Sequence, residues 1–337
     1  MADTVHAEQV DDYRPSDGAE VANHEYREAS LYGVFVDANE SLALIFEQLE
    51  KSGDPKVRIH RDPNIMPDQL PSVLQAADVA IIDHTALPTE IARKCAHLKH
   101  VVFLGTGARS YMNPEELAEL GISVHLIRGY GDTAVAEATI ALMWASARVL
   151  AQMDREMRAG KWLREDALQL TGKALGLIGF GGIAAEVARI ALGSGMRVLA
   201  WNRTPKKYPG VDFVDLDTLL AQCDVVSLHL LLNDETHGFL SPQRIAAMKP
   251  GVILVNTARG ALVDEAAMID ALKSGHIRHA GLDVFNTEPL PADHPLTKLP
   301  NVTLSAHSAF RTQEASENLM GAAWEHCRRI AKESHPL

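Results

Sequence analysis

The feature that most constrains this chain is a glycine-rich turn between an apolar strand and an amphipathic helix. The strand is Ala174–Ile178, and the turn is Gly179-Phe180-Gly181-Gly182-Ile183-Ala184. Gly179 permits a tight turn, and Gly181 lets backbone amides approach a pyrophosphate at the positive end of the helix. A G-x-G-x-x-G match alone is weak, but a strand before it and a helix after it favour a dinucleotide site over an ordinary turn of a sheet protein.

The residues after the next predicted strand, Arg197–Trp201, bear on which dinucleotide binds. NAD sites usually have an Asp or Glu here, bonded to the ribose hydroxyls, whereas this chain has Asn202-Arg203-Thr204. An acidic side chain would repel a 2′-phosphate, and Arg203 with Thr204 could bind one. The loop therefore favours NADP over NAD as the cofactor. A solvated basic loop beside an NAD site is the alternative.

Three separated residues nearer the C-terminus indicate the chemistry. They are Arg259 in Asn256-Thr257-Ala258-Arg259-Gly260, Glu288 in Thr287-Glu288-Pro289 and His307 in Ser305-Ala306-His307-Ser308. An arginine can hold a carboxylate through two parallel hydrogen bonds. A histidine can pass a proton near neutral pH, and a carboxylate beside it orients the ring. Each alone could be structural or solvated, but with the glycine-rich turn they predict hydride transfer between a nicotinamide and a 2-oxo or 2-hydroxy acid.

Alternating strands and helices indicate a doubly wound α/β fold. Strands are predicted at Leu31–Asp37, Val57–His60, Asp78–Asp83 and Lys99–Leu104, and a second series runs from Lys173 to about Ser305. Gly131–Met157 predicts one long Ala-rich helix whose first half is apolar nearly all round, so it should be buried on several sides. Thr312–Lys332 predicts a last helix, which we expect to pack on the first domain.

Four stretches of the chain resemble the D-2-hydroxyacid dehydrogenase family in their order and spacing: Gly172–Ala188, Asn256–Glu265, Gly281–Leu290 and His294–His307. The resemblance covers most of residues 31–330. It implies two doubly wound α/β domains, a flavodoxin-like substrate domain of residues 31–128 plus 309–337 and an inserted Rossmann-type cofactor domain of residues 129–308. It also implies reversible reduction of a 2-oxo acid to an (R)-2-hydroxy acid.

Carried over residue by residue, the resemblance makes Arg259 the ligand of the substrate carboxylate. His307 becomes the proton donor and acceptor, with Glu288 as its hydrogen-bond partner.

The same resemblance implies further contacts in the cofactor domain. Asp283 would meet the nicotinamide carboxamide, and Thr257 and Ala258 would line the nicotinamide pocket through backbone groups. His229 would lie near the cofactor pocket.

In the first domain, the resemblance places substrate-facing amides in the turn Leu104-Gly105-Thr106-Gly107. The chain departs from the family nearby, with His84-Thr85 where relatives often have an Arg-Ser pair and Ala108-Arg109 where an Asp-Asn pair often follows. His84 is therefore a candidate substrate ligand, and Arg109 could meet an additional anionic group or be solvated. These departures leave the identity of the 2-oxo acid open.

The composition of the 337 residues argues against several other classes of protein. A net charge of −12 argues against nucleic-acid binding. The cysteines Cys95, Cys223 and Cys327 are far apart and form no C-x-x-C pair, so we expect no metal site and a cytoplasmic protein. The apolar stretch Ala138–Ala147 is too short to span a membrane. Residues 1–30 show no secretory signal and are interpreted as an acidic extension.

Other assignments remain open from the sequence. Relatives are typically dimers, so a homodimer is expected, and the Ala-rich helix suits such a contact. The resemblance also includes corepressors that sense nicotinamide nucleotides without turnover, and formate- or phosphite-oxidising enzymes; Glu288 counts against a formate enzyme, which has an amide there. A glyoxylate or hydroxypyruvate reductase fits the basic Asn202 loop best, with 3-phosphoglycerate dehydrogenase as an alternative.

Overall fold

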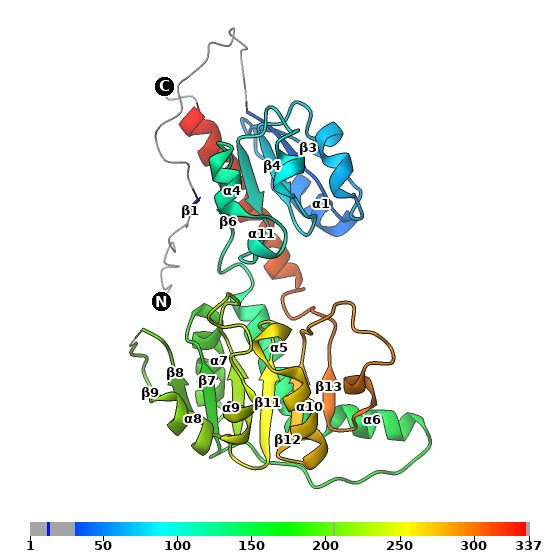
Figure 1. The fold of residues 1–337 in the computed structure, drawn as a ribbon, viewed down its shortest axis with the longest axis vertical. Coiled ribbons are helices and arrows are strands. Elements are labelled where there is room, and N and C mark those ends of the chain that lie inside the picture. Colours follow the sequence, from blue (N-terminus) through cyan, green and yellow to red (C-terminus); the bar gives the residue numbers. More distant parts are fainter. Residues whose placement is uncertain (1–11, 14–30, 205, 335–337) are drawn as a thin grey trace. The chain divides into compact units, whose positions relative to one another are not determined.

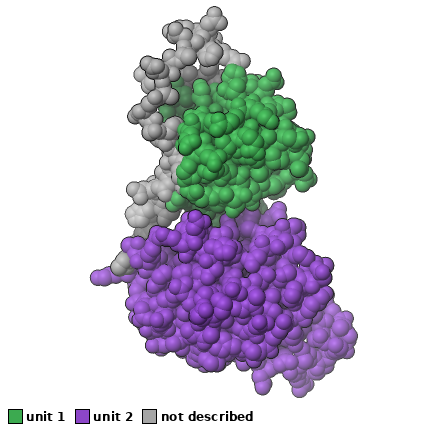
Figure 2. Space-filling model, in the orientation of Figure 1, with its two compact units in different colours: residues 1–131, 312–337 green, residues 132–311 purple. Residues whose placement is uncertain are grey.

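The computed structural model describes residues 12–13, 31–204 and 206–334, so the predicted acidic extension, residues 1–30, lies almost wholly outside the described residues. The chain divides into two compact units (Figure 2). Unit 1 comprises Met1–Gly131 and Thr312–Leu337, and unit 2 comprises Asp132–Arg311. Each unit contains one sheet of mainly parallel strands with helices packed against it (Figure 1).

Unit 1 has a six-stranded sheet with the order β1-β6-β5-β4-β2-β3. Strand β1 pairs antiparallel with β6, and the other neighbouring strands are parallel. Counted from β2, the parallel strands follow the flavodoxin-like order 2-1-3-4-5, which confirms the prediction. The strands are β1 (Asp12–Tyr13), β2 (Tyr32–Phe35), β3 (Lys56–Ile59), β4 (Val79–Ile82), β5 (His100–Phe103) and β6 (Ser123–Leu126). The helices are α1 (Glu40–Gln48), η1 (Pro67–Gln69), α2 (Leu70–Val73), α3 (Thr89–Ala92), η2 (Ala108–Ser110), α4 (Pro114–Glu119) and α11 (Gln313–Ser334).

Alternate residues of the strands in unit 1 enter two different cores, because successive side chains of a strand point to opposite faces. In β4, Ala80 joins the core under α2, α3 and α4, whereas Ile81 joins the core under α1 and α11. Trp324 of α11 stacks on Phe46 of α1 with 4.3 Å between ring centroids. Its indole N–H also donates to the carbonyl oxygen of Phe46 at 2.8 Å. The last helix of the chain is thereby held on the first sheet.

Unit 2 has a seven-stranded sheet with the order β13-β12-β11-β10-β7-β8-β9, and all of its neighbouring strands are parallel. Counted from β7, this is the doubly wound order 3-2-1-4-5-6 of Rossmann folds with one strand added, as predicted. The strands are β7 (Ala174–Ile178), β8 (Arg197–Trp201), β9 (Val211–Phe213), β10 (Val225–Leu228), β11 (Val252–Asn256), β12 (Ile277–Leu282) and β13 (Val302–Leu304). The helices are α5 (Asp132–Ala147), α6 (Leu150–Arg158), α7 (Gly182–Gly193), α8 (Leu216–Gln222), α9 (Pro242–Ala246), η3 (Gly260–Leu262), α10 (Glu265–Ser274) and η4 (Pro295–Lys298).

The prediction of a single helix over Gly131–Met157 is wrong. The segment forms two helices, α5 and α6, with an angle of 64° between them. Val149 between them has a left-handed backbone with φ of 56°, which interrupts the helix. Helix α5 lies on β11, β12, β13 and α7, whereas α6 contacts β13 and α5. As expected from its apolar surface, α5 is buried on more than one side.

Within the described ranges, no single helix is long and apolar enough to cross a membrane. By length and composition alone, α5 and α6 would qualify only as a bent pair.

Candidate functional site

The predicted cofactor and catalytic residues of unit 2 follow the ends of six strands, β7, β8, β10, β11, β12 and β13. In chain order, they lie at Gly179, Asn202, His229, Arg259, Asp283 with Glu288, and His307. Because these strands are parallel, the loops that follow them share the carboxyl edge of the sheet. Ligands of open α/β sheets bind at this edge.

The glycine-rich turn leaves room for a ligand at the start of α7. Gly179 has φ of 90°, and a Cβ there would lie 2.6 Å from the carbonyl oxygen of His229, so a side chain does not fit. Gly181 precedes α7, and a Cβ there would meet nothing within 4 Å. The side chains of Phe180 and Ile183 pack on the core. A helix start with open space in front of it fits the pyrophosphate of a dinucleotide.

The start of α7 also has a carboxylate beside it. A Cβ at Gly182 would overlap the carboxylate of Asp132, the first residue of α5. Negative charge is stabilised at the positive end of a helix, so Asp132 occupies the kind of environment that also favours a phosphate.

The loop after β8 is tied to the glycine-rich turn by Asn202. The Asn202 Oδ1 accepts the N–H of Phe180 at 3.0 Å, and its Nδ2 donates to the carbonyl oxygen of Thr204 at 2.7 Å. Arg203 is exposed and pairs with Glu235 at 2.6 Å between Nη1 and Oε2. Lys206 donates from Nζ to the carbonyl oxygen of Phe180 at 2.6 Å. Asn202 therefore links the loop after β8 to the glycine-rich turn, and the cations Arg203 and Lys206 lie in the same loop.

His229 forms one wall of the glycine-rich turn. Its Nε2 lies 2.9 Å from the hydroxyl of Ser227, and burial lowers the pKa of His229 to about 4. The ring is therefore neutral at neutral pH and contributes no charge to the site.

The turn that carries Arg259 is fixed by the side chain of Asn256, which is buried at 1% exposure. The Asn256 Oδ1 accepts the N–H of Ala258 at 3.0 Å, and its Nδ2 donates to the carbonyl oxygen of Arg259 at 2.9 Å. The half-buried Arg259 donates from Nη1 to the carbonyl oxygen of Ala258 at 2.6 Å. This bond uses one of the five N–H donors of a guanidinium, so the fork can still bind a carboxylate.

The Arg259 turn packs directly on the loop after β12. A Cβ at Gly260 would lie 2.1 Å from the carbonyl carbon of Phe285. The N–H of Phe285 in turn donates to the Oε1 of Glu288 at 2.9 Å, and the Oε2 of Glu288 lies 2.6 Å from the Nδ1 of His307. Contacts and hydrogen bonds thus join the loops of Arg259, Glu288 and His307 into one group.

The imidazole of His307 is held by Glu288 but remains accessible. The side chains of His307 and Glu288 are 37% and 35% exposed. Because Glu288 engages Nδ1, Nε2 is the nitrogen left to exchange a proton with a substrate. The backbone of His307 has φ of 46°, a left-handed conformation that is costly for a residue with a Cβ. Other contacts must hold the loop in this conformation.

Asp283 supplies those contacts. Its carboxylate, in a residue only 1% exposed, accepts the hydroxyl of Ser305 at 2.5 Å and the N–H groups of Ser308 and Ala309 at 3.0 Å each. Its carbonyl oxygen accepts the N–H of His307 at 2.7 Å. The residue expected to meet a nicotinamide carboxamide is thus already bonded to the His307 loop on both sides of the histidine.

Two residues of this edge were not found from the sequence, Asn256 in its bracing role and Thr139. The Thr139 Oγ1 lies 2.8 Å from the Oγ1 of Thr257, and both residues are buried, so α5 is tied to the predicted nicotinamide pocket. Asn256 could have been found from the sequence, because it is the polar residue that ends the apolar run of β11. No signal exists for Thr139, which is an ordinary helix residue distant in sequence.

In unit 1, the predicted substrate residues follow the adjacent parallel strands β4 and β5. Gly105 uses its N–H in a bond to the carbonyl oxygen of Phe103 at 2.8 Å, and Leu104 is buried. The following amides, those of Thr106 and Gly107, are therefore the candidates for an anion.

The ring of His84 is engaged within unit 1. Its Nδ1 lies 3.1 Å from Asp83 and its Nε2 lies 2.6 Å from the carbonyl oxygen of Pro63. The hydrogen bond to Asp83, with the charge of the buried Asp37, raises the pKa of His84 to about 9. Arg109, the candidate for an additional anion, pairs with Glu115 at 3.0 Å between Nη1 and Oε2.

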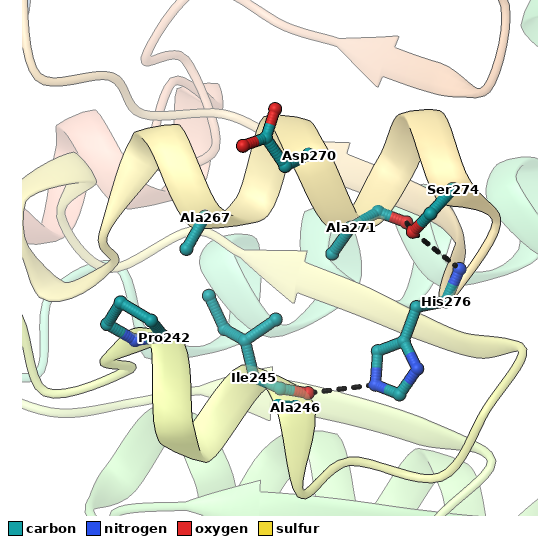
Figure 3. A pocket seen from close by; sticks show the side chains of 8 residues that line it. All are labelled: Pro242, Ile245, Ala246, Ala267, Asp270, Ala271, Ser274 and His276. Atoms are coloured by element: carbon teal, nitrogen blue, oxygen red, sulfur yellow. Dashed lines mark hydrogen bonds between the residues drawn. The ribbon is translucent and has the colours of Figure 1, made fainter.

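A surface groove in unit 2 lies apart from the residues named so far. It runs between α9 and α10 (Figure 3) and is lined by Pro242, Ile245, Ala246, Ala267, Asp270, Ala271, Ser274 and His276. His276 precedes β12, so this end of the groove is at the amino ends of the strands. Among the residues with described side chains, no group of three or more His, Cys, Asp or Glu could hold a metal ion.

A Rossmann-order sheet whose carboxyl edge carries an open glycine-rich turn, a guanidinium and an imidazole–carboxylate pair defines a dinucleotide-dependent oxidoreductase. The comparisons with known proteins identify the family. Residues 140–309 match the model of the D-isomer specific 2-hydroxyacid dehydrogenase NAD binding domain. The chain belongs to the D-isomer specific 2-hydroxyacid dehydrogenase family and is an enzyme of that class.

Individual relatives agree with this assignment. The chain is 34% identical over 271 residues to a hydroxypyruvate reductase of Blautia hydrogenotrophica, covering 77% of this chain and 83% of the relative. A glyoxylate reductase structure from Paecilomyes thermophila is 28% identical with a TM-score of 0.80, covering 91% of this chain and 97% of that one. The structure of an acyclic imino acid reductase in complex with NADPH and D-Arg is 28% identical with a TM-score of 0.77. It covers 90% of this chain and 97% of that one.

Proposed function

We propose that this enzyme reduces a small 2-oxo acid to the (R)-2-hydroxy acid with NADPH, and that glyoxylate and hydroxypyruvate are its substrates. The observation that carries the proposal is the 2.6 Å contact between the Nδ1 of His307 and Glu288, whose loop packs on the Arg259 turn. This arrangement supplies a proton donor and a carboxylate ligand at the edge where a dinucleotide would lie.

The geometry of the side chains supports the roles that the family resemblance implies. Arg259 binds the substrate carboxylate through its guanidinium fork. His307 gives the proton on Nε2 to the oxygen at C2, and Glu288 stabilises the charged ring before the transfer. A bound nicotinamide would supply the hydride for C2. In the reverse direction, His307 accepts the hydroxyl proton.

The backbone groups of Thr257 and Ala258 would hold the nicotinamide, steadied by the hydrogen bond between Thr257 and Thr139. Asp283 acts as a positioning residue, because its carboxylate is bonded to the loop on either side of His307. In unit 1, the Leu104-Gly105-Thr106 turn would present the amides of Thr106 and Gly107 as donors for a substrate carboxylate, because those of Leu104 and Gly105 are already bonded.

The preference for NADP is supported by the loop after β8. No carboxylate follows this strand, and the amide of Asn202 is occupied in bracing the glycine-rich turn. Arg203, Thr204 and Lys206 would instead bind a 2′-phosphate. The related imino acid reductase was solved with NADPH.

We also propose a homodimer. Helix α6 buries none of its residues within the described structure. Leu150 and Met157 on this helix are 52% and 51% exposed, and Trp162 beyond it is 73% exposed. Exposed apolar groups that gather on one segment are typical of a protein contact. Light scattering coupled to size-exclusion chromatography would distinguish a dimer from a monomer.

The reaction is tested by following the absorbance of NADPH and NADH with glyoxylate, hydroxypyruvate, pyruvate and longer 2-oxo acids. We expect turnover to be fastest with NADPH and either glyoxylate or hydroxypyruvate. If the protein bound a dinucleotide but turned over none of these acids, the proposed activity would be wrong.

A further inference from the structure

The ion pair between Arg203 and Glu235 joins two loops at the mouth of the cofactor site. Arg203 follows β8, and Glu235 lies in a turn beyond β10. That turn is well defined, since the Oδ1 of Asn233 accepts the N–H groups of Glu235 and Thr236 at 3.0 Å each. The hydroxyl of Thr236 donates to the carbonyl oxygen of Leu231 at 2.6 Å. The carboxylate of Glu235 is therefore presented to Arg203 from a fixed turn.

A 2′-phosphate would compete with Glu235 for the same guanidinium. In Rossmann folds, the residue that follows the strand equivalent to β8, here Asn202, contacts the adenosine ribose, and Arg203 is the next residue along the chain. Its Nη1 is bonded to Glu235 at 2.6 Å, with both side chains mostly exposed, at 79% and 73%. Arginine forks bind carboxylates and phosphates in the same geometry. A dinucleotide without the 2′-phosphate does not require this guanidinium, so its binding leaves the pair intact.

Lys206 provides a contrast within the same loop. Its ammonium donates to the carbonyl oxygen of Phe180 at 2.6 Å, and an ammonium has three N–H donors. It can therefore meet a phosphate without giving up a carboxylate partner. Of the two cations, Arg203 is the one whose availability depends on an acidic residue.

We infer that Glu235 sets the selectivity of the enzyme between NADPH and NADH by competing with the 2′-phosphate for Arg203. This inference deepens the proposed preference for NADP and rests on it. Replacing Glu235 by Gln removes both the competition and the repulsion between the carboxylate and the phosphate. The contribution of an exposed ion pair corresponds to a change in affinity of about two- to fivefold. Screening by salt should reduce the change.

The test is a set of binding titrations of the intact protein with NADPH, NADH, 2′,5′-ADP and 5′-AMP, at low and high salt. The variants are Glu235→Gln, Arg203→Ala and the double variant. Asp154→Asn is the matched control, because it removes one exposed carboxylate paired with an arginine on α6. We expect Glu235→Gln to tighten NADPH and 2′,5′-ADP about two- to fivefold and to leave NADH and 5′-AMP unchanged. The effect should shrink when Arg203 is absent.

The inference is overturned if Glu235→Gln changes NADPH and NADH equally, changes neither, or weakens NADPH. It is also overturned if Asp154→Asn has the same effect. Failure of the proposed NADP preference has a different signature. In that case the wild-type protein binds NADH at least as tightly as NADPH. The change that Glu235→Gln causes in the ratio of the NADPH and NADH affinities still reports whether Glu235 acts on Arg203.

Discussion

Replacing Asp283 by Ala tests how the protein holds its catalytic histidine. The carboxylate bonds to Ser305, Ser308 and Ala309, which surround His307. The substitution removes all three bonds and frees the loop in which His307 has a left-handed backbone. We expect a loss of both stability and turnover, with cofactor binding largely kept.

The size of the effect follows from where the three donors lie. Hydrogen bonds to charged groups contribute about 1.5–3 kcal/mol each. Ala309 is buried, so loss of its hydrogen bond should cost most of this free energy. Ser305 is half-buried and Ser308 is exposed, so water can replace part of the hydrogen bonds that they lose. Loss of the carboxylate also removes its own desolvation cost. We expect the free energy of unfolding to fall by about 3 kcal/mol.

The effect on turnover comes from the backbone of His307. A left-handed conformation costs roughly 1–2 kcal/mol for a residue with a Cβ. Without its anchor, the loop should favour conformations in which His307 is misplaced, and turnover should fall about tenfold, since 1.36 kcal/mol corresponds to a factor of ten.

The assay combines urea unfolding, steady-state kinetics and NADPH titration on Asp283→Ala. Asp293→Ala is the control, since Asp293 is an exposed carboxylate in the loop between β12 and β13. Unchanged stability together with weaker dinucleotide binding would refute the reasoning. That result would mean that Asp283 acts on the nicotinamide carboxamide, as the family resemblance implies.

Three further predictions follow from burial. Gly260→Ala should lower the free energy of unfolding by about 2 kcal/mol or more, because the new Cβ meets the backbone of Phe285; a stable variant in urea unfolding would contradict this close contact. Burial raises the pKa of Cys223 and Cys327 to about 12. Neither thiol should therefore react with a thiol reagent at about pH 8 until the protein is unfolded. Rapid labelling of the native protein would contradict the burial of these thiols. Burial lowers the pKa of His279 from 6.5 to about 4; the unfolded state therefore binds a proton in this window that the folded state does not, so stability should fall as pH drops from 6.5 to 4. His279→Gln should flatten that fall in denaturant titrations, and an unchanged slope would show that His279 is not responsible.

The fold and the chemistry differ in how much of each the sequence predicts. Two doubly wound parallel sheets follow from apolar runs and the glycine-rich turn, because buried parallel strands leave a strong local pattern; the flavodoxin-like order of the first came from the family resemblance. The break at Val149 was not predicted, because a single left-handed residue within a helical run has no local signal in the sequence. Likewise, the residue types of Arg259, Glu288 and His307 indicate a reaction, but spacing in sequence does not specify contacts.

Those contacts come from strand order. The bonds of Asp283 to the His307 loop, and of Thr139 to Thr257, join segments far apart in the chain. They exist because β11, β12 and β13 are neighbours in the sheet and α5 covers them. A single sequence contains no local trace of such pairings.

The most direct test of the proposed mechanism is the turnover of His307→Gln, measured with NADPH and glyoxylate or hydroxypyruvate beside a titration of NADPH. Loss of a positioned general acid costs about 10²–10⁴-fold in rate, so we expect turnover to fall by at least about a hundredfold while the dissociation constant of NADPH stays close to that of the wild type. Turnover within a few-fold of the wild type would contradict the mechanism, because another group would then have to deliver the proton.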